Sequence, residues 1–265
     1  MSFIISDLEF PIYVQTKNHE GFVYLINLSE IHKQSLHEVY LRSLVERIIP
    51  KLEKIAKDEK LFTLTIIIDG KFFDLIPYLN KKGFNVTDDM VAMVLSLMDY
   101  DKKNIKIKKL SNKYYEIVQF KLQDLNDWIS VIQQSFKRND ERDITLRNFR
   151  KYWLDDPAFE SELHLAIRDT RNNRLVGIIS GFYYPEKRMS HIKLVAVVRD
   201  YQNQGIGSNL LAMLLERLLK RNCLYVTLDV NINNKPAICL YRKFGFVFAY
   251  PIALRKVFPI EKLNA

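Results

Sequence analysis

The chain has 265 residues and is 48% apolar, which is enough to fill the core of one large domain or of two small ones. Its net charge is +9, and residues 114–265 hold 23 basic against 16 acidic side chains, a balance that suits an anionic ligand. No apolar run approaches the length of a membrane span, and Asp7 and Glu9 stand where a signal peptide would be basic. We therefore expect a soluble, cytoplasmic protein with no membrane partner.

The cysteines and histidines of the chain show no spacing that is typical of a metal site or a disulfide. Cys223 and Cys239 are the only cysteines, and we expect both to be reduced thiols. His32 and His37 are five positions apart, which is not the H-E-x-x-H spacing although Glu38 follows. The sequence therefore predicts no metal site.

The N-terminal half contains one clear helix pattern, at residues 41–56. A lysine cluster then spans residues 102–113 and is most simply interpreted as a solvated linker. The other basic residues are scattered and form no zinc-finger or RNP-type pattern. We therefore do not expect a nucleic-acid partner.

The C-terminal half has the pattern of a continuous series of strands and helices. A strand comes first, followed by a helix with Asp124 near its start, a polar stretch and a second helix. A hairpin that turns at residues 171–173 and a further strand come next. In chain order these segments are residues 114–121, 122–136, 137–143, 146–153, 164–169 with 174–184, and 190–198.

The loop Gln202-Asn203-Gln204-Gly205-Ile206-Gly207-Ser208 connects this last strand to an apolar helix pattern at residues 210–219. Glycine lets backbone N–H groups approach a ligand closely. A helix that begins here directs its unpaired N–H groups and the positive end of its dipole to the same place. The loop therefore predicts a phosphate or pyrophosphate site built mainly from backbone.

Two common phosphate-binding loops do not fit these residues. A dinucleotide loop needs a third glycine after G-x-G, but Asn209 and Leu210 stand in that region. A P-loop needs Gly-Lys-Ser/Thr, and no lysine stands between Gly207 and Ser208. The pattern that remains is Gln-x-x-Gly-x-Gly.

A second motif follows the helix. After a β-rich run at residues 224–230, a helix is expected to begin with Asn234 as its N-cap and Pro236 in its first turn. Gly245 is placed to end that helix, and Phe246 to start another strand. The pattern is Leu-x-Val-x-x-x-Asn-x-x-Ala-x-x-Leu-Tyr-x-x-x-Gly-Phe.

Both motifs resemble those of the GNAT superfamily of N-acetyltransferases, in the family's order and at the family's spacing. The resemblance implies an α/β (α+β) acyltransferase fold, with helices flanking a mixed, mostly antiparallel central sheet. It also implies acetyl-coenzyme A as co-substrate, its pantetheine arm along one strand edge and its pyrophosphate in the glycine loop. Arg199 departs from the family, which usually has proline there. The implied cofactor-binding residues are Val195, Ala196, Val197, Gln202, Asn203, Gln204, Gly205, Ile206, Gly207, Ser208, Asn234 and Ala237.

The N-terminal half repeats part of this pattern when the chain is shifted by 162 positions. Residues 65–68 then fall on 227–230, and residues 79–84 on 241–246. Gly205 and Gly207 correspond to Ser43 and Val45, and Tyr241 corresponds to Leu79, so that the loop glycines and the phenol are absent. We interpret residues 1–110 as a shortened, degenerate GNAT-like domain without a cofactor loop, and residues 111–265 as the catalytic GNAT domain.

Acetyl transfer from a thioester to an amine needs a proton donor for the departing thiolate. Tyr241 matches the family tyrosine of the second motif, so the resemblance implies that it is the general acid. A phenol with a pKa of about 10 can protonate a thiolate whose thiol has a pKa near 8.5. Without the motif, a tyrosine beside Leu240 on a helix would be interpreted as a packing residue.

The reaction also needs a base, because an alkylammonium group with a pKa near 10 must lose a proton before it attacks. His191 opens the strand before the cofactor loop, at a position where some family members that this chain resembles carry a glutamate or a histidine. Strand alternation predicts that it shares a face with Lys193, Val195 and Val197. His191 is the candidate base. The same role is open to ordered water and to four further side chains, which are Glu160, Glu162, His164 and Glu186.

These inferences predict an acetyl-CoA-dependent N-acetyltransferase that modifies an amine of a small molecule or peptide by direct attack in a ternary complex. Two other functions stay open: a non-catalytic acyl-CoA-binding regulatory or scaffold protein, and an acyltransferase with a longer acyl or an aminoacyl donor. Tyr241 and Asn234 favour an active enzyme. The sequence determines neither the acceptor nor whether the chain forms a homodimer.

Overall fold

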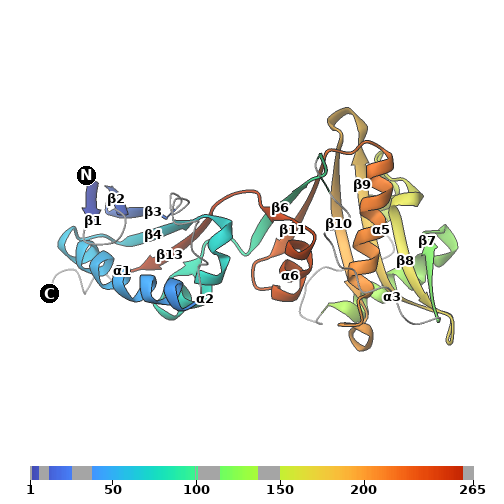
Figure 1. Cartoon of the computed structure of the whole chain (residues 1–265), viewed down its shortest axis with the longest axis horizontal. Helices are drawn as coiled ribbons and strands as arrows, with labels where there is room; N and C mark the ends of the chain where they lie inside the picture. The colour runs from blue at the N-terminus through green and yellow to red at the C-terminus, as the bar shows by residue number, and fades with distance from the viewer. Residues whose placement is uncertain are drawn as a thin grey trace. The chain divides into compact units, whose positions relative to one another are not determined.

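The computed structural model describes residues 2–5, 12–25, 38–98, 100, 114–136 and 150–258. The chain forms two compact units, and Figure 1 colours them along the sequence. Unit 1 comprises Met1–Val91, Asn231–Asn233 and Val247–Ala265, and unit 2 comprises Ala92–Val230 and Asn234–Phe246. The expected linker at 102–113 and the polar stretch at 137–143 lie outside the described residues.

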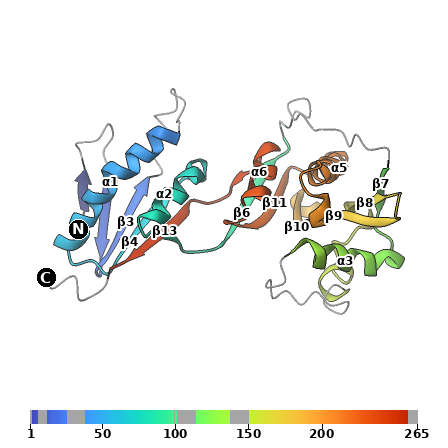
Figure 2. The same cartoon turned by 90° about the horizontal axis from the view of Figure 1, so that it is seen from below.

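Unit 1 is built on a six-stranded sheet with the order β1-β2-β3-β4-β13-β5. Strands β3 and β4 are parallel, and the other recorded pairs are antiparallel. Helices α1 and α2 lie on one face of this sheet (Figure 2), and α1 contains the helix predicted at 41–56. The elements are β1 (Ser2–Ile5), β2 (Ile12–Lys17), β3 (Glu20–Leu25), α1 (Glu38–Asp58), β4 (Thr63–Ile68), α2 (Ile76–Lys81), β5 (Asn85–Val86) and β13 (Ile252–Val257).

The second sheet has seven strands in the order β12-β6-β11-β10-β9-β8-β7. Strands β10 and β11 are parallel, whereas β7, β8, β9 and β10 pair antiparallel in succession, so the predicted mixed and mostly antiparallel sheet is confirmed. The elements are β6 (Met90–Ser96), β7 (Tyr115–Gln119), α3 (Leu125–Ser135), β8 (His164–Asp169), β9 (Arg174–Tyr184), β10 (Met189–Val197), α5 (Ile206–Lys220), β11 (Tyr225–Asn231), α6 (Lys235–Lys243) and β12 (Val247–Phe248).

Most elements predicted in the C-terminal half are present within a few residues of their expected bounds. The second helix pattern, at 146–153, lies only partly inside the described residues, which record a single π-helical turn at Arg150–Leu154. None of the helices in the described part of the chain is both long and apolar enough to cross a membrane.

The shift of 162 positions also relates the two sheets. It carries the start of β4 onto the start of β11, β5 onto β12, and β6 onto β13. By position in the sheet, the order β2-β3-β4-β13-β5 corresponds to β9-β10-β11-β6-β12, except that β6 and β13 have exchanged sheets. The shift itself carries the start of β2 onto the start of β9, but it places β3 before β10. This correspondence supports the interpretation of the N-terminal half as a degenerate repeat. The division predicted at residue 110 did not include the exchange, because a sequence shift gives the order of strands and not their partners.

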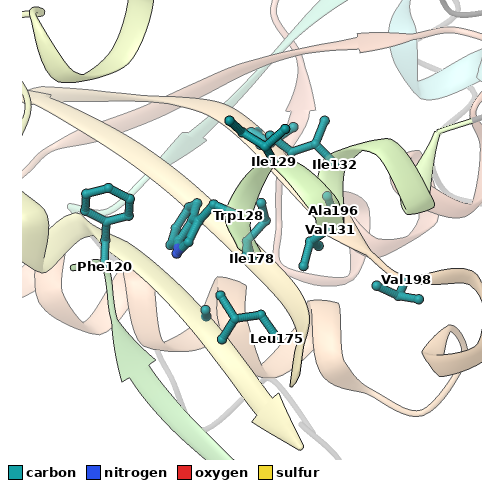
Figure 3. Packing of buried hydrophobic residues seen from close by; sticks show 11 residues of the cluster. Phe120, Trp128, Ile129, Val131, Ile132, Leu175, Ile178, Ala196 and Val198 are labelled. Atoms are coloured by element: carbon teal, nitrogen blue, oxygen red, sulfur yellow. The ribbon is translucent and has the colours of Figure 1, made fainter. Parts of the chain in front are cut away.

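Helices α3 and α5 cover opposite faces of the sheet in unit 2 (Figure 2). Beneath α3, the ring of Trp128 meets Phe120 edge-on at a centroid distance of 5.1 Å. On the other face, a Cβ added at Gly177 or Gly181 would come within 3.0 Å of Ile206 or Leu214, so these glycines let α5 lie close to β9. The core beneath α3 (Figure 3) consists of Phe120, Trp128, Ile129, Val131, Ile132, Ala166, Leu175, Ile178, Leu194, Ala196 and Val198.

Candidate functional site

A cleft of about 360 Å³ lies in unit 2 where β10, α5 and α6 converge. Its walls are the end of α3, residues 195–197 of β10, the loop from Tyr201 to Ser208, and α6 with its cap. All predicted site residues line this cleft except Gln204 and His191. The fold therefore brings the two sequence motifs together around a single concave site.

The glycine loop has the geometry of an anion cradle. Gly205, the N-cap of α5, has φ 85° and ψ 1°, a left-handed conformation that glycine adopts without strain. Helix α5 begins at Ile206, so the N–H groups of its first turn have no partner within the helix. A Cβ at Gly207 would lie 3.3 Å from Leu240 and 3.8 Å from Val197, in the narrow space between the loop and α6. The loop thus suits a pyrophosphate held by backbone groups.

Two glutamines hold this loop in place. Gln202 donates from Nε2 to the carbonyl oxygen of Val197 at 3.0 Å. Gln204 donates to the carbonyl oxygen of Asp200 at 3.1 Å and accepts from the hydroxyl of Tyr115 at 2.8 Å. Gln204 therefore supports the loop from outside the cleft, which explains why it is not part of the lining.

Strands β10 and β11 pair over only part of their length. Their register runs from Met189↔Tyr225 to Ile192↔Leu228, while β10 continues to Val197. The segment 195–197 faces the cleft instead of a neighbouring strand on that side. An amide-rich chain could pair with its backbone there as an added strand does.

Helix α6 begins as its sequence predicted. Asn234 accepts a hydrogen bond from the N–H of Ala237 at 3.2 Å, and Pro236 lies in the first turn. Gly245 has φ 89° just after the helix. This cap fixes the part of α6 that lines the cleft.

Comparison with known proteins identifies this part of the chain. Residues 123–246 match the model of the acetyltransferase (GNAT) family. These residues form a GNAT acetyltransferase domain. A structure of a GCN5-related N-acetyltransferase from Sphaerobacter thermophilus has a TM-score of 0.51 at 17% identity and covers 93% of this chain and 76% of its own, which shows the shared fold.

Two similar proteins are enzymes by name. Mycothiol acetyltransferase of Clavibacter michiganensis is 30% identical over 129 residues, which are 48% of this chain and 40% of that protein. The [ribosomal protein bS18]-alanine N-acetyltransferase of Escherichia coli K12 is 34% identical over 88 residues, which are 33% of this chain and 57% of that protein. The matched regions thus span about half the length of these relatives.

Tyr241 lies in the wall of the cleft of the GNAT domain and is only 7% exposed. Burial raises the pKa of its phenol to about 12, so the hydroxyl keeps its proton at neutral pH. Its ring packs beside Phe246 at a centroid distance of 5.7 Å. The tyrosine is therefore packed into the cleft wall, with its hydroxyl protonated.

His191 lies outside the cleft lining, and the prediction that it shares a face with Val195 and Val197 is wrong. The register with β9 shifts by one residue between Ile192 and Leu194, so Lys193 is an inserted bulge residue. His191 lies opposite Phe182 and Ala196 opposite Ile178, and these two β9 residues share a face. His191 thus lies on the same face of the sheet as Ala196, which is the face covered by α3. The inserted residue reverses the alternation of side chains between the two faces.

The other candidate bases are held in different environments, and none of them lines the cleft. Glu160 and Glu162 both form ion pairs with Arg221. Glu186 is exposed in the turn after β9. His164 is 1% exposed, with Nδ1 2.6 Å from Ser180 Oγ, and burial lowers its pKa to about 3. Of these four groups, His164 is part of the buried core.

Several cleft residues were not predicted from the sequence. Ser135 and Phe136 come from the end of α3, Tyr201 precedes the glycine loop, and Pro236 and Leu240 lie within the second motif. Tyr201 is held in place by a 3.2 Å hydrogen bond from its hydroxyl to Asp169. The signal for the last three was their position in or beside the motifs, whereas the α3 residues become neighbours only through the fold.

The described residues of unit 1 lack the corresponding features. Ser43 and Val45 lie inside α1, which begins at Glu38, so no helix starts at the position equivalent to the glycine loop. Strands β3 and β4 pair over their whole length, from Glu20↔Thr63 to Leu25↔Ile68, so no strand edge opens between them.

The cysteines are free thiols, with Cys223 buried and Cys239 exposed. Within the described ranges, no group of three or more His, Cys, Asp and Glu side chains could hold a metal ion. His32 and His37 lie outside the described residues.

Proposed function

We propose that this chain is an acetyl-CoA-dependent N-acetyltransferase that acts on an amine of a small molecule or peptide. The observation that carries the proposal is the single cleft that joins the glycine loop, the open edge of β10 and Tyr241. One relative is named for mycothiol and another for an alanine of a ribosomal protein, so the relatives do not decide between acceptors. The acceptor is therefore specified only as an amine.

The residues present fit acetyl-CoA. The first turn of α5 and the backbone around Gly205 and Gly207 would hold the pyrophosphate, and residues 195–197 would pair with the amides of the pantetheine arm. When bound there, the cofactor would supply the acetyl group as an activated thioester. A Cβ at Gly207 would enter the space this arrangement needs.

The protein side chains then perform the proton transfers of a direct attack in a ternary complex. His191 accepts a proton from the acceptor ammonium, directly or through water, which leaves an amine able to attack the carbonyl carbon. A backbone N–H near Val197 would stabilise the negative charge that develops on the carbonyl oxygen. Tyr241 would donate its phenolic proton to the sulfur as the carbon–sulfur bond breaks. The nitrogen would lose its second proton to solvent as the amide forms, and Tyr241 would regain a proton from solvent.

A thiol-release assay tests the proposal. Wild-type chain is incubated with acetyl-CoA and a panel of amines, peptides and aminoglycosides, and free coenzyme A is measured with a thiol reagent. We expect release that depends on at least one acceptor, with the acetylated product seen by mass spectrometry. Tight coenzyme A binding without release for any acceptor would instead indicate a binding or scaffold protein.

A further inference from the structure

Two side chains of β11 lie against His191. The parallel register pairs His191 with Thr227, and His191 Nδ1 is 3.0 Å from Thr227 Oγ1. Asp229 lies two residues further along β11, on the same face by alternation. Its Oδ2 is 3.9 Å from the other ring nitrogen, His191 Nε2. Each nitrogen of the imidazole therefore faces a different kind of group.

The hydrogen-bond partners of Thr227 favour one neutral tautomer of His191. The hydroxyl of Thr227 has one proton, and its Oγ1 is 3.3 Å from the carbonyl oxygen of Ser190, which can only accept. When that proton is donated to Ser190, Oγ1 accepts from His191, and the ring proton then lies on Nδ1. Nε2 then carries the lone pair. The separation of 3.9 Å is too long for a hydrogen bond to Asp229 but close enough for attraction once the ring is charged.

We propose that Thr227 is a positioning residue that holds neutral His191 as the Nδ1–H tautomer, and that Asp229 stabilises the imidazolium formed when Nε2 accepts the acceptor's proton. The proposal rests on the proposed function, because it presumes an amine to be deprotonated. In the step, the acceptor ammonium loses one proton and becomes a neutral amine. Nε2 gains that proton, and Asp229 stays ionised throughout.

The other charges near His191 act in opposite directions. Burial lowers the pKa of the imidazole, Asp229 raises it, and the ammonium of Lys193 lowers it. Lys193 is itself paired with Asp156 at 2.7 Å and lies 3.7 Å from the ring centroid of Phe182. Strand β9 presents only Phe182 opposite His191, without a charge. Asp229 is therefore the group in direct contact that favours the charged ring.

Imidazole nitrogen NMR tests the assignment without any substrate. The whole chain is labelled with ¹⁵N-histidine, and the His191 signals are identified by their loss in His191→Gln. At a pH where the ring is neutral, we expect a protonated Nδ1 and an unprotonated Nε2. A wild-type ring found as the Nε2–H tautomer would overturn the proposal, whatever the outcome of any activity assay.

Variants separate the two roles. Thr227→Val should abolish the tautomer preference, and Thr227→Ser, which keeps a hydroxyl, should retain it. Asp229→Asn, at an exposed side chain, should lower the pKa of His191 while leaving the tautomer unchanged. Glu116→Gln is the matched control, because this exposed carboxylate lies on β7, three strands away from β10. An unmoved pKa in Asp229→Asn would contradict the role of Asp229.

Kinetics connect the assignment to the reaction. With an accepted amine, Thr227→Val should lower kcat on the order of tenfold, and Thr227→Ser should restore most of it. Asp229→Asn should move the acidic limb of the pH–rate profile to lower pH, because an imidazole with a lower pKa stays neutral, and therefore basic, down to a lower pH. If no amine is acetylated, the proposed function fails while the NMR result still decides the tautomer. Full turnover in Thr227→Val would count against the positioning role alone.

Discussion

Tyr241 is the residue whose chemistry can be tested most simply. Its phenol lies in the cleft wall with a pKa of about 12, so it is protonated at every pH used in an ordinary assay. Tyr241→Phe should lower kcat on the order of 10²-fold, because it removes only a proton donor used as the thiolate departs. The dissociation constant of acetyl-CoA, measured by calorimetry, should stay unchanged. Unaltered turnover would show that Tyr241 is a packing residue.

His191 gives a prediction about pH. Burial lowers the pKa of its imidazole below the ordinary value, so the neutral, basic form is already populated at slightly acidic pH. The rate should therefore fall only as the pH drops below about 6.5, the unperturbed value. His191→Gln should remove this limb and lower kcat. If the limb persists at full activity, the base is water or another group.

The bulge at Lys193 shows what could not be predicted at the residue scale. The sequence pattern identified the strand, the glycine loop and Tyr241, because each depends on local spacing. The face of His191 depends instead on one residue inserted between Ile192 and Leu194, and no local signal marks it. The strict alternation of side chains assumed for this strand therefore does not hold across the bulge.

At the scale of elements, one buried histidine links β8 and β9 to the segment before them. Ser180 Oγ lies 2.6 Å from Nδ1 of His164 and accepts from Trp153 Nε1 at 3.1 Å, while the ring of Phe159 stacks on the imidazole at 4.3 Å. Burial lowers the pKa of His164 to about 3. The folded chain thus keeps this ring neutral where the unfolded chain would charge it.

The stability of the fold should therefore depend on His164 in acid. Below about pH 6.5 the unfolded state binds a proton that the folded state does not, so the free energy of unfolding should fall by up to about 1.4 kcal/mol per pH unit until the folded ring also titrates. Urea unfolding at pH 6 and pH 5 measures this slope. His164→Gln should flatten it, and an equal slope in the variant would show that other groups cause the loss.

The positions of helices and strands along the chain were more predictable than the pairing of the strands in the sheets. Helix α6 has the expected cap at Asn234, and α5 begins at the expected glycines, because caps and turns depend on neighbouring residues. The exchange of β6 and β13 was not predicted, since each strand has the same pattern whichever sheet it joins. The opening of β10 away from β11 likewise depends on tertiary pairing.

The whole molecule combines one unit that has the features of a cofactor site with one whose described residues lack them. Unit 2 has a helix that starts at two glycines beside an open strand edge. In unit 1 the corresponding helix runs through that position without a break, and the corresponding strands are fully paired. We infer that unit 1 has a structural role and binds no cofactor of its own.

The central claim is that the chain binds one coenzyme A, in the cleft of unit 2. Calorimetric titration of the whole chain with acetyl-CoA tests it most directly. We expect one site per chain in the wild type and in Ser43→Val, the matched change at an exposed position of unit 1, and no binding in folded Gly207→Val, because its side chain would fill the space beside Leu240. Two sites per chain, or wild-type affinity in folded Gly207→Val, would contradict the account.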